Sequence, residues 1–134
     1  MAYTAHDPRV FYDAVVTQLA SSTGKNIGKA QAPSPTAVPY AVVYPLDESD
    51  TNTSLADLTD VTIFRWQVSS IGDSLDQVLW MQQKVRAALL GWIPTVAGIS
   101  VMPVAREGGF SASRDDDVQP PKYFVGDIFT AFAD

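Results

Sequence analysis

The segment KYFVGDIFTAFA, residues 122–133, constrains the fold more than any other part of this chain. Side chains of a β-strand alternate between the two faces of a sheet. Alternation places bulky apolar residues on both faces: Phe124, Ile128 and Phe132 on one, Tyr123, Val125 and Phe129 on the other. A strand of this kind must be covered on both sides. The sequence therefore predicts a sheet whose last strand lies against the subunit's own core and against a helix or a neighbouring subunit.

A second alternating segment, VTIFRWQVSSI at residues 61–71, predicts a half-buried strand. Its two faces divide the residues into Phe64, Trp66 and Val68 against Ile63, Arg65 and Gln67. After a turn at Gly72, Asp73 and Asp76 resemble a capping box that opens a helix ending near Leu90, with Gly91 just beyond it. The expected apolar stripe of that helix is Leu75, Val78, Leu79, Val85 and Leu89.

The sequence signals for the remaining helix and strands are weaker. Asp7-Pro8 predicts the start of a helix that ends near Ala20, and residues 38–45 and 99–105 predict short strands. Long loops are expected near residues 21–37, 46–60 and 106–121, with a short extended piece near Ile27. The order α-β-β-α-β-β predicts an α+β fold, with two helices packed on a mostly antiparallel four- to five-stranded sheet. The 134 residues are expected to form a single domain, 1–134.

Composition narrows the function. The chain has no cysteine, which excludes disulfides, thiolate nucleophiles and cysteine metal sites. A net charge of −6 argues against binding duplex nucleic acid through its phosphates. The first residues carry no signal-peptide pattern, and no apolar run approaches the roughly 20 residues that span a bilayer. We expect a soluble protein without a membrane partner.

No motif supports catalysis or a cofactor. Residues 24–29, GKNIGK, look superficially like a phosphate loop, but the glycine spacing is short, Ala30 follows the lysine, and a helix precedes the segment. The only histidine, His6, precedes the first helix in a terminal segment and has no evident catalytic partner. We expect no catalytic residue, no cofactor and no enzymatic activity.

Two acidic stretches are candidates for binding. One is an acid-only segment that holds Asp47, Glu48, Asp50, Asp57 and Asp60; the other is Arg114 followed by Asp115, Asp116 and Asp117. Neither has the ligand spacing of a calcium-binding EF-hand loop, and consecutive aspartates do not readily face one ion. We expect no metal site, and we interpret both stretches as solvated, lumen-facing or partner-facing loops.

Three stretches carry a resemblance to a known family. They are PYAVVYPLDES at residues 39–49, the strand and helix VTIFRWQVSSIGDSLDQVLWMQQKVRAALLGW at 61–92, and RDDDVQPPKYFVGDIFTAFA at 114–133. In order and spacing the chain resembles the tail terminator proteins of long-tailed phages (siphoviruses) of actinobacterial hosts, which are related in fold to the lambda-like tail terminator. The strand-to-helix segment is the most specific part of the match, which covers most of residues 38–132.

The resemblance implies a structural role in the virion. Such proteins form a hexameric ring on the head-proximal end of the tail tube, stop tube polymerisation and present a surface for head joining. The implied partners are other copies of the chain, the tail tube protein and a head-completion or connector protein, and genomic DNA crosses the lumen without specific binding. Assembly in the host cytoplasm and a place at the head-proximal end of the tail follow from the same resemblance.

A ring subunit needs apolar surface beyond its own core. The candidates for that subunit interface are Trp80, Met81, Trp92, Tyr123 and Phe129, although each can equally be a residue of the internal core. Two other functions stay open: another head–tail connector or neck protein of similar fold, and a small metal- or ligand-binding domain that uses the acidic loops.

Overall fold

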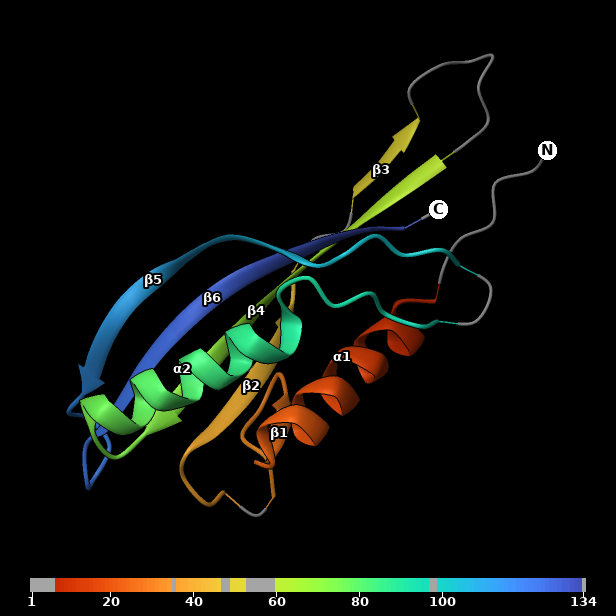
Figure 1. Cartoon of the computed structure of the whole chain (residues 1–134). Coiled ribbons are helices and arrows are strands. Elements are labelled where there is room, and N and C mark those ends of the chain that lie inside the picture. The colour runs from red at the N-terminus through yellow and green to blue at the C-terminus, as the bar shows by residue number, and fades with distance from the viewer. Residues whose placement is uncertain (1–6, 35, 47–48, 53–59, 97–98, 134) are drawn as a thin grey trace.

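The structure is a computed structural model that describes residues 7–133, except 35, 47–48, 53–59 and 97–98 (Figure 1). Two helices and six strands make up the described part of the chain. In chain order they are α1 (Pro8–Thr23), β1 (Ile27–Lys29), β2 (Tyr40–Pro45), β3 (Ser49–Asn52), β4 (Asp60–Gly72), α2 (Leu75–Leu89), β5 (Ala105–Asp115) and β6 (Lys122–Ala133).

The six strands form one sheet in the order β1-β2-β4-β6-β5, with β3 paired to the first part of β4. All pairings are antiparallel except that of β1 with β2. β4 is the longest strand and the hub of the sheet, because it pairs with β2, β3 and β6. The predicted α+β class, with two helices on a mostly antiparallel sheet, is confirmed; β1 and β3 add short strands to the expected set.

Both helices lie on the same face of the sheet, where they bury its core (Figure 1). Phe11 of α1 stacks on Phe64 of β4 with ring centroids 4.1 Å apart and planes inclined by 7°. Trp66 of β4 meets the Phe11 ring edge-on. From α2, Met81 and Val85 enter the same cluster. Burying each of these side chains contributes about 1.5–3 kcal/mol, so this layer is the main source of stability.

The ends of the helices follow their capping residues. Asp7 caps α1 by accepting a hydrogen bond from the Arg9 backbone amide at 3.0 Å, as predicted, and Gly24 ends the helix with φ 69°. At α2 the predicted capping residue was wrong. Ser74 is the N-cap and accepts from the Gln77 amide at 3.1 Å, while Gln77 Oε1 accepts from the Asp73 amide. This arrangement is a variant of the capping box, because Gln77 accepts from the amide of Asp73, the residue before the cap, rather than from the amide of Ser74.

The predicted stripe of α2 is shifted. Val78, Val85 and Leu89 are buried as expected, whereas Leu75 and Leu79 are exposed. Met81 and Ala88 are buried in their place. At 3.6 residues per turn, Leu75 and Leu79 lie on the flank of the buried stripe, toward β5, and so remain available at the surface.

The largest correction concerns residues 99–115. The predicted strand at 99–105 is absent: Ile99 and Val101 make only isolated bridges, and Val104 hydrogen bonds to the backbone of Gly91 and Trp92. The predicted loop at 106–121 instead contains β5, which runs from Ala105 to Asp115. β5 is an edge strand with two register irregularities, so pairing with β6 forms it despite its glycines and charges.

Candidate interaction surfaces

A buried carboxylate ties α2, β5 and β6 together. Asp127 of β6, whose side chain is 1% exposed, accepts hydrogen bonds from Arg86 of α2 at 2.9 and 3.0 Å and from Arg106 of β5 at 2.7 Å. Both arginines remain about 40% exposed. Two guanidinium groups therefore share one carboxylate and leave a net positive charge in a cavity of 440 Å³ between α2 and β5.

The electrostatics of this group follow from its hydrogen bonds. Burial alone would raise the pKa of Asp127, but the hydrogen bonds from Arg86 and Arg106 outweigh burial and hold that pKa below its ordinary value. The hydrogen bond to Asp127 also raises the pKa of Arg86. Asp127 and Arg86 are therefore both charged near neutral pH, and the group acts as a fixed ionic site rather than a proton-transfer pair.

Most other basic residues are each matched by one carboxylate. The ion pairs are Arg9–Asp7, Lys29–Asp13, Arg65–Glu107, Arg114–Asp116 and Lys122–Asp73. Lys25 and Lys84 have no carboxylate partner in the described part of the chain and instead flank the ring of Trp80, at 5.6 and 5.5 Å from its centroid. Unmatched positive charge is therefore concentrated on the side that carries α2.

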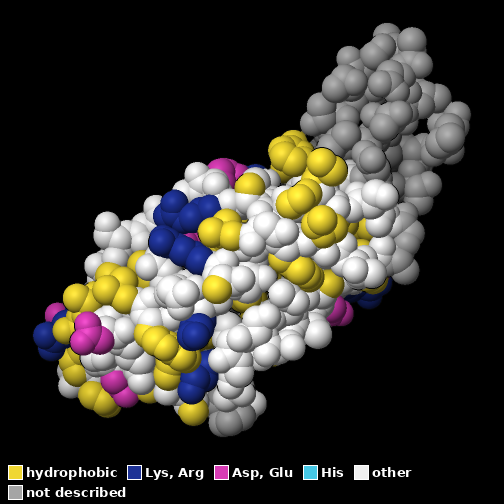
Figure 2. Space-filling view, in the orientation of Figure 1, with side chains coloured by type: hydrophobic (Ala, Val, Ile, Leu, Met, Phe, Trp, Pro, Cys, Tyr) yellow, Lys and Arg dark blue, Asp and Glu magenta, His cyan; other side chains and the backbone are white. Residues whose placement is uncertain are grey.

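We call this area the α2 face and define it by Lys25, Leu75, Leu79, Trp80, Lys84, Arg86 and Arg106. Its apolar members, Leu75, Leu79 and Trp80, are 42–46% exposed. Figure 2 views the side that carries the helices and shows Lys and Arg side chains there in separate clusters, with hydrophobic and uncharged side chains between them. The α2 face thus combines cations with exposed apolar area, as interface surfaces do.

The opposite face of the sheet carries no helix and is also apolar. A groove of 520 Å³ lies there, lined by Tyr40, Tyr44, Ile71 and Phe124 together with Val118 of the turn after β5. β6 was predicted to be covered on both faces; within the subunit the helices cover one face, and covering of the other by a neighbouring subunit stays a prediction. Val125 and Phe129 are buried beneath the helices, whereas Phe132 on the other face is 45% exposed.

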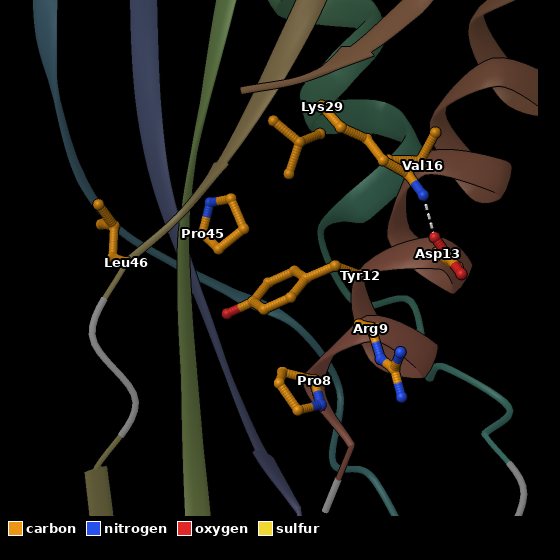
Figure 3. Close-up of a pocket in the computed structure, with 9 residues that line it drawn as sticks. Pro8, Arg9, Tyr12, Asp13, Val16, Lys29, Pro45 and Leu46 are labelled. Carbon is orange, nitrogen blue, oxygen red and sulfur yellow. Dashed lines mark hydrogen bonds and ion pairs between the residues drawn. The ribbon is translucent and has the colours of Figure 1, made fainter. Parts of the chain in front are cut away.

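A third hollow lies between α1 and the outer edge of β2 (Figure 3). Its volume is 480 Å³, and Tyr12, Pro45 and Leu46 line it with Val16 of α1. At its rim Lys29 Nζ donates to Asp13, as the dashed line in Figure 3 marks. The lining holds no arrangement of nucleophile, base and acid, so its chemistry fits an apolar contact better than a reaction.

The aspartate triplet forms the turn between β5 and β6. Asp115 ends β5 and its Oδ1 accepts from the Asp117 amide at 3.0 Å, while Asp116 pairs with Arg114 at 2.6 Å. Asp116 and Asp117 are exposed. Each carboxylate interaction is local, which is the pattern of a polar turn. In the described residues, no three His, Asp or Glu side chains lie close enough to hold a metal ion.

The structure separates the other predicted residues. Met81 and Phe129 are fully buried in the subunit's own core, Trp92 packs partly against that core, and Tyr123 is half-buried on β6. Only Trp80 of the five apolar candidates is exposed. His6, Asp47, Glu48 and Asp57 lie outside the described residues, and Asp50 and Asp60 belong to β3 and β4 by their backbone.

Sequence reasoning missed the Arg86–Asp127–Arg106 group. A signal for it existed, because Asp127 falls between Val125 and Phe129 on the buried face of an apolar strand. A carboxylate at such a position needs a cationic partner. The sequence did not indicate which arginines are the partners of Asp127, because Arg106 was predicted to lie in a loop.

Within the described residues, no helix is long and apolar enough to cross a membrane. No family model matches the chain, and no curated protein matches it. Among solved structures, the chain is similar in fold to a chain of the virion of a native gene transfer agent particle, with a TM-score of 0.70, 19% identity, and coverage of 97% of this chain and 98% of that one. A second solved chain aligns with a TM-score of 0.61, 12% identity and coverage of 95% and 92%.

Proposed function

We propose that this chain is a structural subunit of a phage-like virion. The observation that carries the proposal is the end-to-end correspondence with the gene transfer agent virion chain, which spans 97% of one chain and 98% of the other.

Within that class, the resemblance in the segments at residues 39–49, 61–92 and 114–133 favours the tail terminator. In this proposal six copies form a ring on the head-proximal end of the tail tube, stop its growth and provide the surface for head joining. A closed ring needs two different contact surfaces on each subunit. The exposed α2 face is one surface that supports such a contact, and the apolar groove on the opposite side of the sheet leaves a second surface for another partner.

The net charge of −6 suits passage of DNA through the ring. An acidic wall repels phosphates, so DNA crosses without adhering. The Asp115–Asp117 turn is the described acidic segment best placed for such a wall, because Asp116 and Asp117 are exposed and the turn projects from the end of the β5–β6 hairpin (Figure 1).

Deleting the gene from its genome and imaging the particles by electron microscopy tests this proposal. A terminator predicts tails of uncontrolled length that are not joined to heads, and restoration of normal particles by the gene in trans. Tails of normal length that fail to join heads would instead identify a connector or neck protein. Normal particles in the deletion strain would refute the virion role.

A further inference from the structure

We infer that the α2 face binds the acid-rich segment at residues 46–60 of a second copy of this chain. The inference adds the identity of the two contacting surfaces to the proposed assembly, and it rests on that proposal only in requiring that copies associate. It starts from the distribution of charge, which is uneven along the chain and over the surface.

The unmatched positive charge lies on one face. Five of the nine Lys and Arg residues each have one carboxylate partner in an ion pair. The other four are Arg86 and Arg106, which share Asp127, and Lys25 and Lys84, which flank Trp80. Even when Asp127 and the exposed Asp76 of α2 are counted against these four cations, the α2 face keeps an excess of positive charge, so it favours an acidic partner.

The matching negative charge lies elsewhere in the same sequence. Residues 46–60, LDESDTNTSLADLTD, contain five acidic residues and no Lys or Arg. The segment also contains Leu46, Leu55 and Leu58. Its mixture of carboxylates and leucines is complementary to the mixture of cations and exposed apolar side chains on the α2 face. Complementary charge of this kind gives specificity and a fast association rate.

One chain cannot bring these two surfaces together. β3 and the first residues of β4 extend beyond the helices at one end of the sheet, while α2 begins at the other end, just after Gly72 (Figure 1). The 13 residues of β4 span roughly 40 Å at about 3.3 Å per residue, and the 15 residues of α2 run back along it for only about 22 Å at about 1.5 Å per residue, so even the far end of α2 stays roughly 18 Å short of β3. The contact therefore joins two copies, each giving its acidic segment and receiving another's.

Such a contact is heterologous. The two surfaces differ, so each copy can bind one neighbour on each side, and the chain of contacts either closes into a ring or continues as a filament. The inference assigns the 46–60 segment to a neighbouring subunit rather than to a channel wall.

The test uses two full-length charge-reversed variants. Lys25→Glu with Lys84→Glu makes the receiving face acidic. Asp47→Lys, Asp50→Lys and Asp57→Lys together make the segment basic, because three lysines then stand against two carboxylates. Neither lysine has an ion-pair partner among the described residues. Sedimentation velocity at low ionic strength should show that each variant associates at least roughly tenfold more weakly than the natural chain. An equimolar mixture should assemble, because both contacts between unlike copies then pair opposite charges.

Lys29→Glu with Arg114→Glu is the matched control, because it changes net charge by the same amount at two exposed ion pairs away from the α2 face. The inference is overturned if this control weakens association equally, if the mixture fails to assemble, or if the natural chain stays monomeric at low salt. It is also overturned if Asp115→Lys with Asp117→Lys, rather than the 46–60 variant, restores assembly. Binding of duplex DNA that Lys25→Glu with Lys84→Glu abolishes would assign the face to nucleic acid instead.

The two proposals fail separately. If Lys25→Glu with Lys84→Glu supports normal particles and normal association, the contact is wrong while the virion role stands. If deletion of the gene leaves particles unchanged, the virion role is wrong whatever the mixture does.

Discussion

The ring of Phe110 on β5 lies directly over Gly126 on β6. The two residues face each other in the strand register, and a Cβ placed on Gly126 would come within 2.2 Å of the Phe110 ring. The ring also lies 6.2 Å from that of Phe124, centroid to centroid. Gly126 thus provides the space in which an aromatic side chain of the edge strand closes over the helix-free side of the sheet.

Substituting Gly126→Ala should lower the free energy of unfolding by about 1–2 kcal/mol, because the Phe110 ring must swing aside. In a Phe110→Ala background the same substitution should cost close to nothing, since the obstructing atoms are gone. A double-mutant cycle by urea denaturation measures the coupling. Equal costs in the two backgrounds would show that the ring is not seated over the glycine.

Gly109 and Gly108 should behave differently although they are adjacent. A Cβ on Gly109 would lie 2.4 Å from the Gly126 carbonyl oxygen and 3.0 Å from both Arg106 Nη2 and Asp127 Oδ1, whereas one on Gly108 meets nothing within 4 Å. Gly109→Ala should therefore destabilise the protein by about 2 kcal/mol or more, and Gly108→Ala by less than about 0.5 kcal/mol. Thermal unfolding of the two variants side by side provides the comparison, and equal melting temperatures would contradict it.

Asp127→Asn should cost about 2–3 kcal/mol at pH 7, because two guanidinium groups lose their shared carboxylate. The folded-state pKa of Asp127 is below its unfolded value of about 3.9, so its contribution is fully present above that value. As pH falls further, through the folded-state pKa, the contribution is lost. The stability difference between the natural chain and the variant should therefore shrink below about pH 4.

Urea denaturation across this acidic range checks the pH dependence. Asp116→Asn is the control, since it removes an exposed ion pair worth at most about 1 kcal/mol. A difference for Asp127→Asn that stays constant down to the most acidic pH at which the protein folds would contradict the assignment.

We expect Ser74 rather than Asp73 to stabilise the N-terminus of α2. Ser74→Ala removes the acceptor of the Gln77 amide and should cost about 1 kcal/mol. Asp73→Ala removes only an exposed ion pair with Lys122 and should cost less than about 0.5 kcal/mol. Thermal melts followed by circular dichroism distinguish the two, and the reverse order of costs would restore Asp73 as the cap.

Quenching of tryptophan fluorescence should report the charge around Trp80. Trp66 is fully buried, whereas Trp80 is exposed between two lysines. Iodide should therefore quench the protein more strongly than caesium at equal ionic strength, because the lysines attract the anion. Lys25→Glu with Lys84→Glu should reverse that preference, and Trp80→Phe should remove most of it. Equal quenching by both ions in the natural chain would contradict the arrangement.

The sequence alone predicted the helices and strands correctly wherever local residue patterns agreed with the final packing. The alternation around Phe64 and Trp66 predicted the buried face of β4, and Asp7-Pro8 predicted the start of α1. The segment near Ile27 was expected to be extended and is β1. In each case the residue pattern itself requires the structure, because burial of alternate side chains or capping of free amides depends on near neighbours.

The sequence alone did not predict the structure of segments whose conformation depends on hydrogen-bond partners far away in the chain. Residues 105–115 contain two glycines and charged residues, which disfavour a strand locally, yet β6 supplies the hydrogen bonds that form one. Residues 99–104 look like a strand, but they follow an irregular course. The Gly91 amide donates to the Val104 carbonyl, the Val104 amide donates to the Trp92 carbonyl, and the Met102 amide donates to the Phe132 carbonyl. The cationic group around Asp127 was missed for the same reason, since three separate elements build it.

The position of β6 affects when the subunit can form. This strand lies between β4 and β5, both of which precede it in the chain. One edge of β4 is therefore unpaired, and β5 has no partner strand in the described sheet, until residues 122–133 have been synthesised. The inner face of β4 keeps Trp66 without its neighbour Phe129 during that interval. Asp127 arrives with the same strand, so Arg86 and Arg106 receive their shared carboxylate last, and this part of the α2 face is completed only when β6 is in place.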